Sequence, residues 1–125
     1  MPEPFDIQSS EWAEQVESED RPVMVEYWHH KCVVCKTMKP IYEAQPEVFG
    51  DEIKFTRMNL LESKENRRFA IRGGVRSTPT FILYCNGRPV GQIIGSREPE
   101  EFTNELRMLM GKASDCLMAT PLDEE

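Results

Sequence analysis

The sequence predicts an α/β fold with a central mixed β-sheet flanked by helices on both faces. Its 125 residues are enough for one domain. Hydrophobic spacing along the chain gives the order helix, strand, helix, strand, helix, hairpin and helix. A strand-helix-strand unit supplies parallel strands and a hairpin supplies antiparallel ones, so the combination predicts a mixed sheet.

A helix and a strand begin the chain. Ser9 and Ser10 can cap a helix that carries Val16 on its apolar face. The apolar run over residues 22–28 is typical of a strand that is buried on both faces of a sheet. Glu26 is the only acid in this run, and burial there would disfavour its charged form.

A second helix and strand complete the strand-helix-strand unit. Apolar residues recur at helical spacing from Cys35 onward. Pro40 must kink this helix or mark its effective restart, because proline removes an amide donor and crowds the preceding turn. Residues 53–59 then alternate between apolar and polar side chains, which predicts a strand.

The second half of the chain predicts a helix followed by a hairpin. Ser63 can cap the helix, and the glycine pair at 73–74 stops it. The Asn-Gly pair at 86–87 is a strong hairpin signal between the apolar runs 80–85 and 89–94.

A final helix is expected after the hairpin. Pro99 lies in its first turn, acidic residues follow, and Gly111 closes it. We therefore expect one domain over residues 1–111 and a flexible acidic tail over residues 112–125.

Composition and charge exclude several classes of function. The chain has 22 acidic and 15 basic residues, and its net charge of −7 argues against a nucleic-acid partner. The longest apolar runs are far shorter than the ~20 residues that span a bilayer, so no membrane association is expected. The start of the chain, MPEPFD, lacks the basic and apolar regions of a signal peptide. We expect a soluble cytoplasmic protein in a reducing compartment.

Two of the four cysteines are three positions apart, where a strand gives way to a helix. Cys32 and Cys35 are either half of a metal site or a redox dithiol. At a helix N-terminus, unpaired amides and the helix dipole favour the thiolate form of Cys32, which is the form that attacks disulfides. Cys35, one turn further on, is placed to resolve the mixed disulfide. Cys85 is expected to be a packing residue or a free surface thiol, Cys116 has no assigned role, and a disulfide between the two stays open because sequence separation does not determine the Cα distance.

Basic and titratable side chains surround this pair in an otherwise acidic chain. A local positive potential would stabilise a thiolate and attract partner proteins with acidic surfaces. The residues concerned are His29, His30, Lys31, Lys36 and Lys39, with Arg72 and Arg76 from a later loop.

Several landmarks, in the same order, resemble those of the thioredoxin family. They are the strand 25–28, the Cys-Val-Val-Cys motif at 32–35, Pro40, the loop 77–81, the Asn-Gly turn at 86–87 and Gly95. In that family they correspond to the active-site strand, the redox motif, the kinked helix, the cis-proline loop, the hairpin turn and the glycine before the last helix. The resemblance covers roughly residues 5–111. It implies a thioredoxin fold and a protein-disulfide reductase that needs no bound metal or organic cofactor.

The resemblance also implies the roles of three catalytic residues. Cys32 would be the nucleophile and Cys35 the resolving thiol, and the two would form the redox-active disulfide. Glu26 corresponds to the family's buried acid, which is aspartate in typical thioredoxins and glutamate in protein disulfide isomerases. A buried acid with a raised pKa can exchange a proton with Cys35 near neutral pH.

The substrate-binding residues follow from the same resemblance, with Pro79 as the cis-proline and Thr78 as the residue that pairs with the target backbone. The expected set is Trp28, Lys31, Val33, Val34, Thr78, Pro79 and Gly95. Three of its positions depart from the family: Lys31 replaces a tryptophan, and the Val33-Val34 pair replaces the Gly-Pro of typical thioredoxins. Because the two valines place no imidazolium between the sulfurs, we expect a reductase rather than a strong oxidant. It would act as a monomer on disulfide-containing proteins and receive electrons from an upstream reductase of unidentified type.

Two alternatives belong to different classes. His29, Cys32 and Cys35 offer three soft metal ligands, and Cys85 or Cys116 could complete a site. Alternatively, the fold could serve as a redox-inert interaction module.

Overall fold

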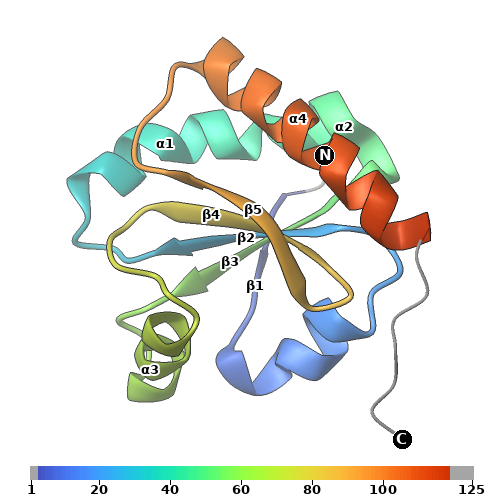
Figure 1. Ribbon diagram of the computed structural model, residues 1–125. Coiled ribbons are helices and arrows are strands. Elements are labelled where there is room, and N and C mark those ends of the chain that lie inside the picture. The colour runs from blue at the N-terminus through green and yellow to red at the C-terminus, as the bar shows by residue number, and fades with distance from the viewer. Residues whose placement is uncertain (1–2, 119–125) are drawn as a thin grey trace, which may run out of the picture.

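A five-stranded mixed sheet forms the centre of the molecule, in a computed structural model that describes residues 3–118 (Figure 1). The strand order is β1-β3-β2-β4-β5. β3 pairs in parallel with β1 and with β2, whereas β4 is antiparallel to both β2 and β5. The strands are β1 (Phe5–Asp6), β2 (Val23–Trp28), β3 (Lys54–Asn59), β4 (Thr80–Cys85) and β5 (Arg88–Ile94).

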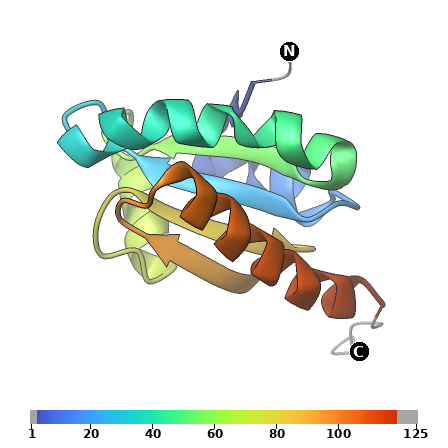
Figure 2. The same cartoon turned by 90° about the horizontal axis from the view of Figure 1, so that it is seen from above.

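Helices cover both faces of this sheet (Figures 1 and 2). One face carries α1 (Val33–Glu43), α2 (Gln45–Phe49) and α4 (Pro99–Met118). The other carries α3 (Lys64–Arg72) and the short turns η1 (Ser9–Glu11) and η2 (Ala13–Glu17), while η3 (Gly50–Glu52) joins α2 to β3. The predicted α/β fold is confirmed. No helix within residues 3–118 is long and apolar enough to cross a membrane.

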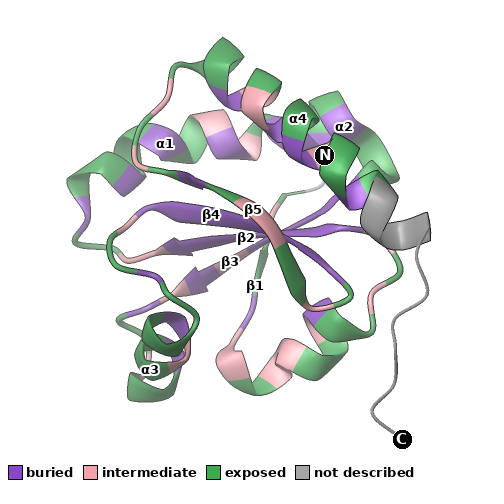
Figure 3. Cartoon of the chain, viewed as in Figure 1, coloured by how far each residue is buried: buried purple, intermediate pink, exposed green. Residues whose placement is uncertain are grey.

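The central strands are buried on both faces and separate two hydrophobic cores (Figure 3). Alternate side chains of β2 enter different cores: Met24 faces α1 and α4, whereas Val23 and Val25 face α3 and the N-terminal turns. Glu26 shares the face of Met24, because residues two apart in a strand point the same way. The core on this face contains three phenylalanines that pack around Tyr42.

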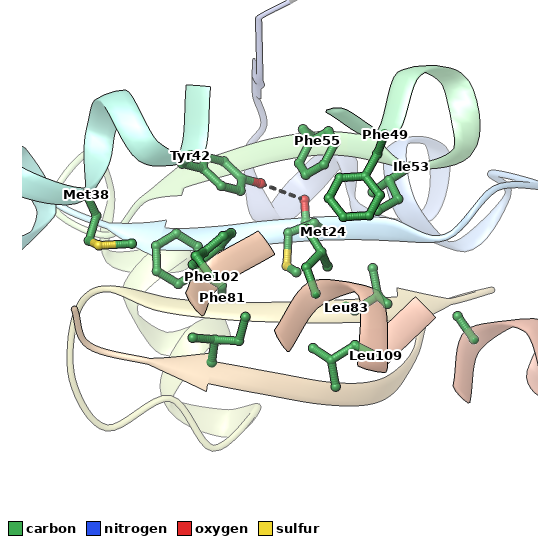
Figure 4. Close-up of a cluster of buried hydrophobic side chains, with 13 residues drawn as sticks. Met24, Met38, Tyr42, Phe49, Ile53, Phe55, Phe81, Leu83, Phe102 and Leu109 are labelled. Atoms are coloured by element: carbon green, nitrogen blue, oxygen red, sulfur yellow. Dashed lines mark hydrogen bonds between the residues drawn. The ribbon is translucent and has the colours of Figure 1, made fainter. Parts of the chain in front are cut away.

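Tyr42 binds α1 to the middle of the sheet. Its hydroxyl donates to the Thr56 carbonyl at 2.7 Å and lies 3.2 Å from the Met24 carbonyl (Figure 4). The Thr56 hydroxyl donates to the same Met24 carbonyl at 2.9 Å. These contacts are buried, where a hydrogen bond lost without a replacement costs about 1–3 kcal/mol. Tyr42 therefore holds α1 in one position on β2 and β3.

The predicted boundaries hold for most elements, but the first segment differs. Residues 9–17 form a 3-10 turn and a π-helical turn instead of a regular helix, and the short strand β1 before them was not predicted. Strand β1 has two residues, too few to show alternation. Pro40 does lie inside α1, and Ala44 then ends that helix so that α2 is a separate element.

The expected end of the last helix at Gly111 was wrong, since α4 continues to Met118. Gly111 does not have the positive φ of a helix-terminating glycine, and Ala113 beyond it is fully buried in the core. Because Ala113 becomes buried in the next turn, continuing the helix is favourable even though Gly111 is a poor helix former. The predicted tail over residues 112–125 is therefore helical as far as residue 118, and residues 119–125 lie outside the described part of the chain.

Replacing Gly111 with alanine should stabilise the protein by about 0.5 to 1 kcal/mol, because glycine is a poor helix-interior residue. A Cβ at this position would meet no atom within 4 Å. Gly50→Ala is the matched control, since Gly50 has a φ of 58° and alanine there should destabilise the protein. Denaturant unfolding of the oxidised protein measures both effects. A loss of stability in Gly111→Ala would show that the helix ends at this residue.

Candidate active site

The two sulfurs lie at the N-terminus of α1. Cys32 and Cys35 form a disulfide, with 5.2 Å between their Cα atoms. Cys32 is the N-cap of the helix, and its Sγ accepts a hydrogen bond from the Cys35 amide at 3.1 Å. It is 9% exposed, against 3% for Cys35. In the reduced pair, this amide and the helix dipole would stabilise negative charge on Cys32, the more accessible sulfur.

A distant loop covers the sulfurs with a backbone carbonyl. The Thr78-Pro79 peptide bond is cis, and the Thr78 carbonyl oxygen lies 3.5 Å from Cys32 Sγ. The Gly95 amide donates to the Pro79 carbonyl at 2.9 Å. The fold thus brings Thr78, Pro79 and Gly95 to the cysteine pair from positions far along the chain.

The remaining residues expected to bind substrate lie on or beside the same turn. Lys31 is exposed, and Val33 and Val34 are 74% and 39% exposed. Trp28 ends β2 and is partly buried. Two exposed branched apolar side chains beside a disulfide offer a contact surface to another protein.

Glu26 is fully buried in the middle of β2, and neither of its carboxylate oxygens has a hydrogen-bond partner among the described residues. Burial raises the pKa of Glu26 to about 7, and the Arg57 guanidinium opposes this shift only in part. Arg57 Nη2 lies 3.5 Å from Glu26 Oε1. This carboxyl can therefore gain or lose a proton near neutral pH.

Arg57 connects Glu26 to other charged groups, and sequence pattern alone does not select it. It lies opposite Glu26 in the parallel pairing of β2 and β3, so only the register of the sheet brings the two together. Its Nη1 is 3.8 Å from Glu43 Oε2, which Lys39 also binds at 2.9 Å. Its guanidinium lies over the Trp28 ring at 4.5 Å from the centroid. Nothing in the pattern distinguishes Arg57 from the other polar residues of this strand, which are Lys54, Thr56 and Asn59.

A cavity of about 140 Å³ joins these charged groups to Cys35. Its walls include Cys35, Trp28 and Arg57, with His29, His30, Lys36 and Lys39 completing it. Glu26 is not part of the wall and reaches it through Arg57. The Trp28 Nε1 and Arg57 Nε atoms are also buried without a partner among the described residues. A cavity of this size, with charged side chains in its wall, can hold the water that a proton transfer to or from Cys35 would need.

The site gives no support to the metal alternative. Within residues 3–114, no group of three or more His, Cys, Asp and Glu side chains is arranged to hold a metal ion. Burial lowers the pKa of His29, as do its neighbours His30 and Lys31.

Cys85 lies fully buried at the far end of β4 and is not a free thiol, so the expectation of a free surface thiol there was wrong. The Cys116 side chain lies outside the described residues.

Comparison with known proteins gives a consistent result. The Thioredoxin family model matches residues 3–108. The chain is 34% identical over 87 residues to a thioredoxin of Alicyclobacillus acidocaldarius subsp. acidocaldarius, which covers 70% of this chain and 80% of that protein. It is 27% identical over 104 residues to a thioredoxin of Haemophilus influenzae, and this match covers 83% of this chain and 94% of that protein. It is also 37% identical over 101 residues to the chloroplastic thioredoxin M4 of Arabidopsis thaliana, covering 79% of this chain but only 51% of that longer protein.

Replacing Glu26 with glutamine should remove a pH dependence of stability. The raised pKa means that the contribution of protonated Glu26 is complete below about pH 4.5 and is lost as pH rises through about 7. The unfolding free energy of Glu26→Gln relative to wild type should therefore increase by on the order of 3 kcal/mol from about pH 4 to about pH 8.

Denaturant unfolding of the oxidised protein measures this difference without titrating the thiols. Glu65→Gln, which removes an exposed acid from α3, controls for the loss of one negative charge. A difference between Glu26→Gln and wild type that stays constant over this range would show that Glu26 titrates normally.

Proposed function

Because the chain belongs to the thioredoxin family, it is a thiol-disulfide oxidoreductase, and we propose that it works as a reductase of disulfides in other proteins. One observation carries this proposal: the Cys32–Cys35 pair lies at a helix N-terminus with the Thr78 carbonyl 3.5 Å from its outer sulfur. Cys32 is the attacking sulfur and Cys35 the resolving one.

The proposed exchange has two steps. The Cys32 thiolate attacks one sulfur of the substrate disulfide, whose S–S bond breaks and whose other sulfur leaves as a thiolate that takes up a proton. Cys35 then loses its proton and attacks Cys32 Sγ, which releases the second substrate sulfur. The substrate gains two electrons and two protons, and the enzyme ends as the Cys32–Cys35 disulfide. The Thr78 carbonyl accepts a backbone N–H of the substrate beside Pro79 and Gly95, in the manner of an added strand.

Glu26 takes the proton that Cys35 must lose in the second step. A pKa of about 7 suits this role, because a base acts best when its pKa is near the working pH. The cavity that Cys35 shares with Arg57 provides the route, and Arg57, whose Nη2 lies 3.5 Å from Glu26 Oε1, positions the carboxyl beside it. Glu26 is thus the base, whereas Arg57 is a positioning residue.

The residues between the two cysteines support the reducing direction. Val33 and Val34 place no imidazolium between the sulfurs, so nothing in the motif selectively stabilises the reduced form and makes the disulfide a strong oxidant. The cytoplasm keeps thiols reduced, and we place the protein there as a monomer that receives electrons from a separate reductase.

His30, Lys31 and Lys36 give the face around Cys32 a positive charge that suits substrates with acidic surfaces.

Equilibration with glutathione buffers, followed by counting of free thiols, tests the reductase. We expect one two-electron transition near −270 mV, the potential of a reducing thioredoxin. Cys32→Ser should lose the transition and the reduction of protein disulfides. A potential near −120 mV would show an oxidase instead, and the absence of any transition would favour the redox-inert interaction module.

Glu26→Gln should also slow the release of substrate from the mixed disulfide, by roughly 10- to 100-fold at neutral pH. The measurement uses wild type and variant proteins carrying a reporter thiol on Cys32, with release of the reporter followed over a range of pH. The wild-type rate should rise with an inflection near pH 7, where Glu26 ionises, and the variant should lack it. Glu43→Gln, which removes the second acid beside Arg57, should retain the inflection. Equal rates in Glu26→Gln and wild type would exclude Glu26 as the base.

A further inference from the structure

A groove of about 380 Å³ is lined by Thr78, by residues of α3 and by the loop that leads from α3 to β4. Through Thr78 it lies close to Cys32, because Thr78 O is 3.5 Å from Cys32 Sγ. Neither cysteine lines this groove or the larger one of about 690 Å³ between α1, α2 and α4, but of the two only the groove along α3 includes Thr78. The groove along α3 is the one that a substrate bound at the sulfurs would enter.

The charge of the groove is opposite to that of the whole chain. Two arginines, Arg67 and Arg76, line it together with His29, and no acidic residue does. Neither arginine forms an ion pair or a side-chain hydrogen bond within the part of the chain that the structure describes. The nearest acids along the chain are Glu65, which is exposed on α3 and does not line the groove, and Glu62, which is bound to Gln8 at 2.8 Å. In a protein of net charge −7, two exposed guanidinium groups without a partner are available to a ligand.

The groove also presents apolar side chains to solvent. Leu61 is 42% exposed and Ile71 is 52% exposed. Ile71 lies one helical turn after Arg67 on α3, so the two share one face of the helix. A cationic and an apolar contact are therefore side by side in the groove.

We propose that this groove selects, among the disulfides that the proposed reductase acts on, those whose target cysteine is flanked by an acidic and an apolar residue. A guanidinium binds a carboxylate through two parallel hydrogen bonds, which gives direction as well as attraction. Arg67 and Arg76 bind the acidic side chain, Leu61 and Ile71 pack against the apolar one, and the Thr78 carbonyl holds the backbone between them and Cys32. Arg67 and Arg76 are specificity-determining residues and take no part in the exchange of sulfurs.

Three peptides with the same disulfide but different flanking residues test the proposal: Asp and Leu, Gln and Leu, or Lys and Leu, placed on either side of the cysteine. Single-turnover reduction by the pre-reduced protein gives a second-order rate constant for each. We expect the acidic peptide to react about 3- to 10-fold faster than the neutral one, the range for a few exposed charge pairs. The basic peptide should react more slowly, and both differences should shrink as salt is added.

Variants assign the effect to the groove. In Arg67→Gln/Arg76→Gln the ratio of acidic to neutral rate constants should fall to about 1, whereas Arg67→Lys/Arg76→Lys should retain part of it. Arg68→Gln is the matched control, because Arg68 is the next residue of α3 and does not line the groove. It should leave the ratio unchanged.

The outcomes separate this proposal from the one on which it rests. If wild type reduces none of the peptides, the reductase itself is wrong. If it reduces all three at equal rates, the reductase stands and the selectivity is wrong. A ratio that survives in Arg67→Gln/Arg76→Gln would assign selectivity to the charges around Cys32 and overturn the role of this groove.

Discussion

The burial of β2 on both faces is the constraint on which the redox site depends. This strand pairs with β3 on one side and β4 on the other, and its residues 23–27 are all buried. Because β2 cannot shift without moving both cores, its end is a fixed point, and the turn that follows delivers Cys32 to the N-cap of α1. Tyr42 holds that helix to the backbone of β2 and β3.

The same burial determines the acid–base chemistry. Glu26 lies where water cannot solvate its charge, and a single guanidinium at 3.5 Å does not compensate for that loss. The result is a carboxyl with a pKa of about 7, near the working pH of a proton carrier. A shorter contact to Arg57 with good hydrogen bonds would favour the charged form and make Glu26 a poorer proton acceptor at neutral pH.

Charge is divided unevenly over the surface. The chain as a whole is acidic, yet the residues around Cys32 and those along α3 are mostly basic. Interactions between exposed charges are weak and screened by salt, so this arrangement suits recognition and encounter rather than stability. Specificity for a partner can then vary by surface substitutions that leave both cores unchanged.

The sequence by itself determined the class of the fold, the cysteine pair and the loop that covers it. Spacing and turn residues sufficed for these, because strand alternation, the Asn86-Gly87 turn and the Cys-x-x-Cys motif are local properties. Local pattern misled where burial prevailed, as at Gly111, through which α4 continues to bury Ala113.

Tertiary structure alone decided which charges meet. Arg57 faces Glu26 through the register of two parallel strands, and Arg67 and Arg76 line one groove formed by α3 and the loop that follows it. Neither arrangement leaves a mark in the sequence, because packing rather than sequence spacing brings these residues together. The sequence therefore identified the cysteine pair and Glu26, and the packing of the sheet and α3 determined which charged groups lie beside them.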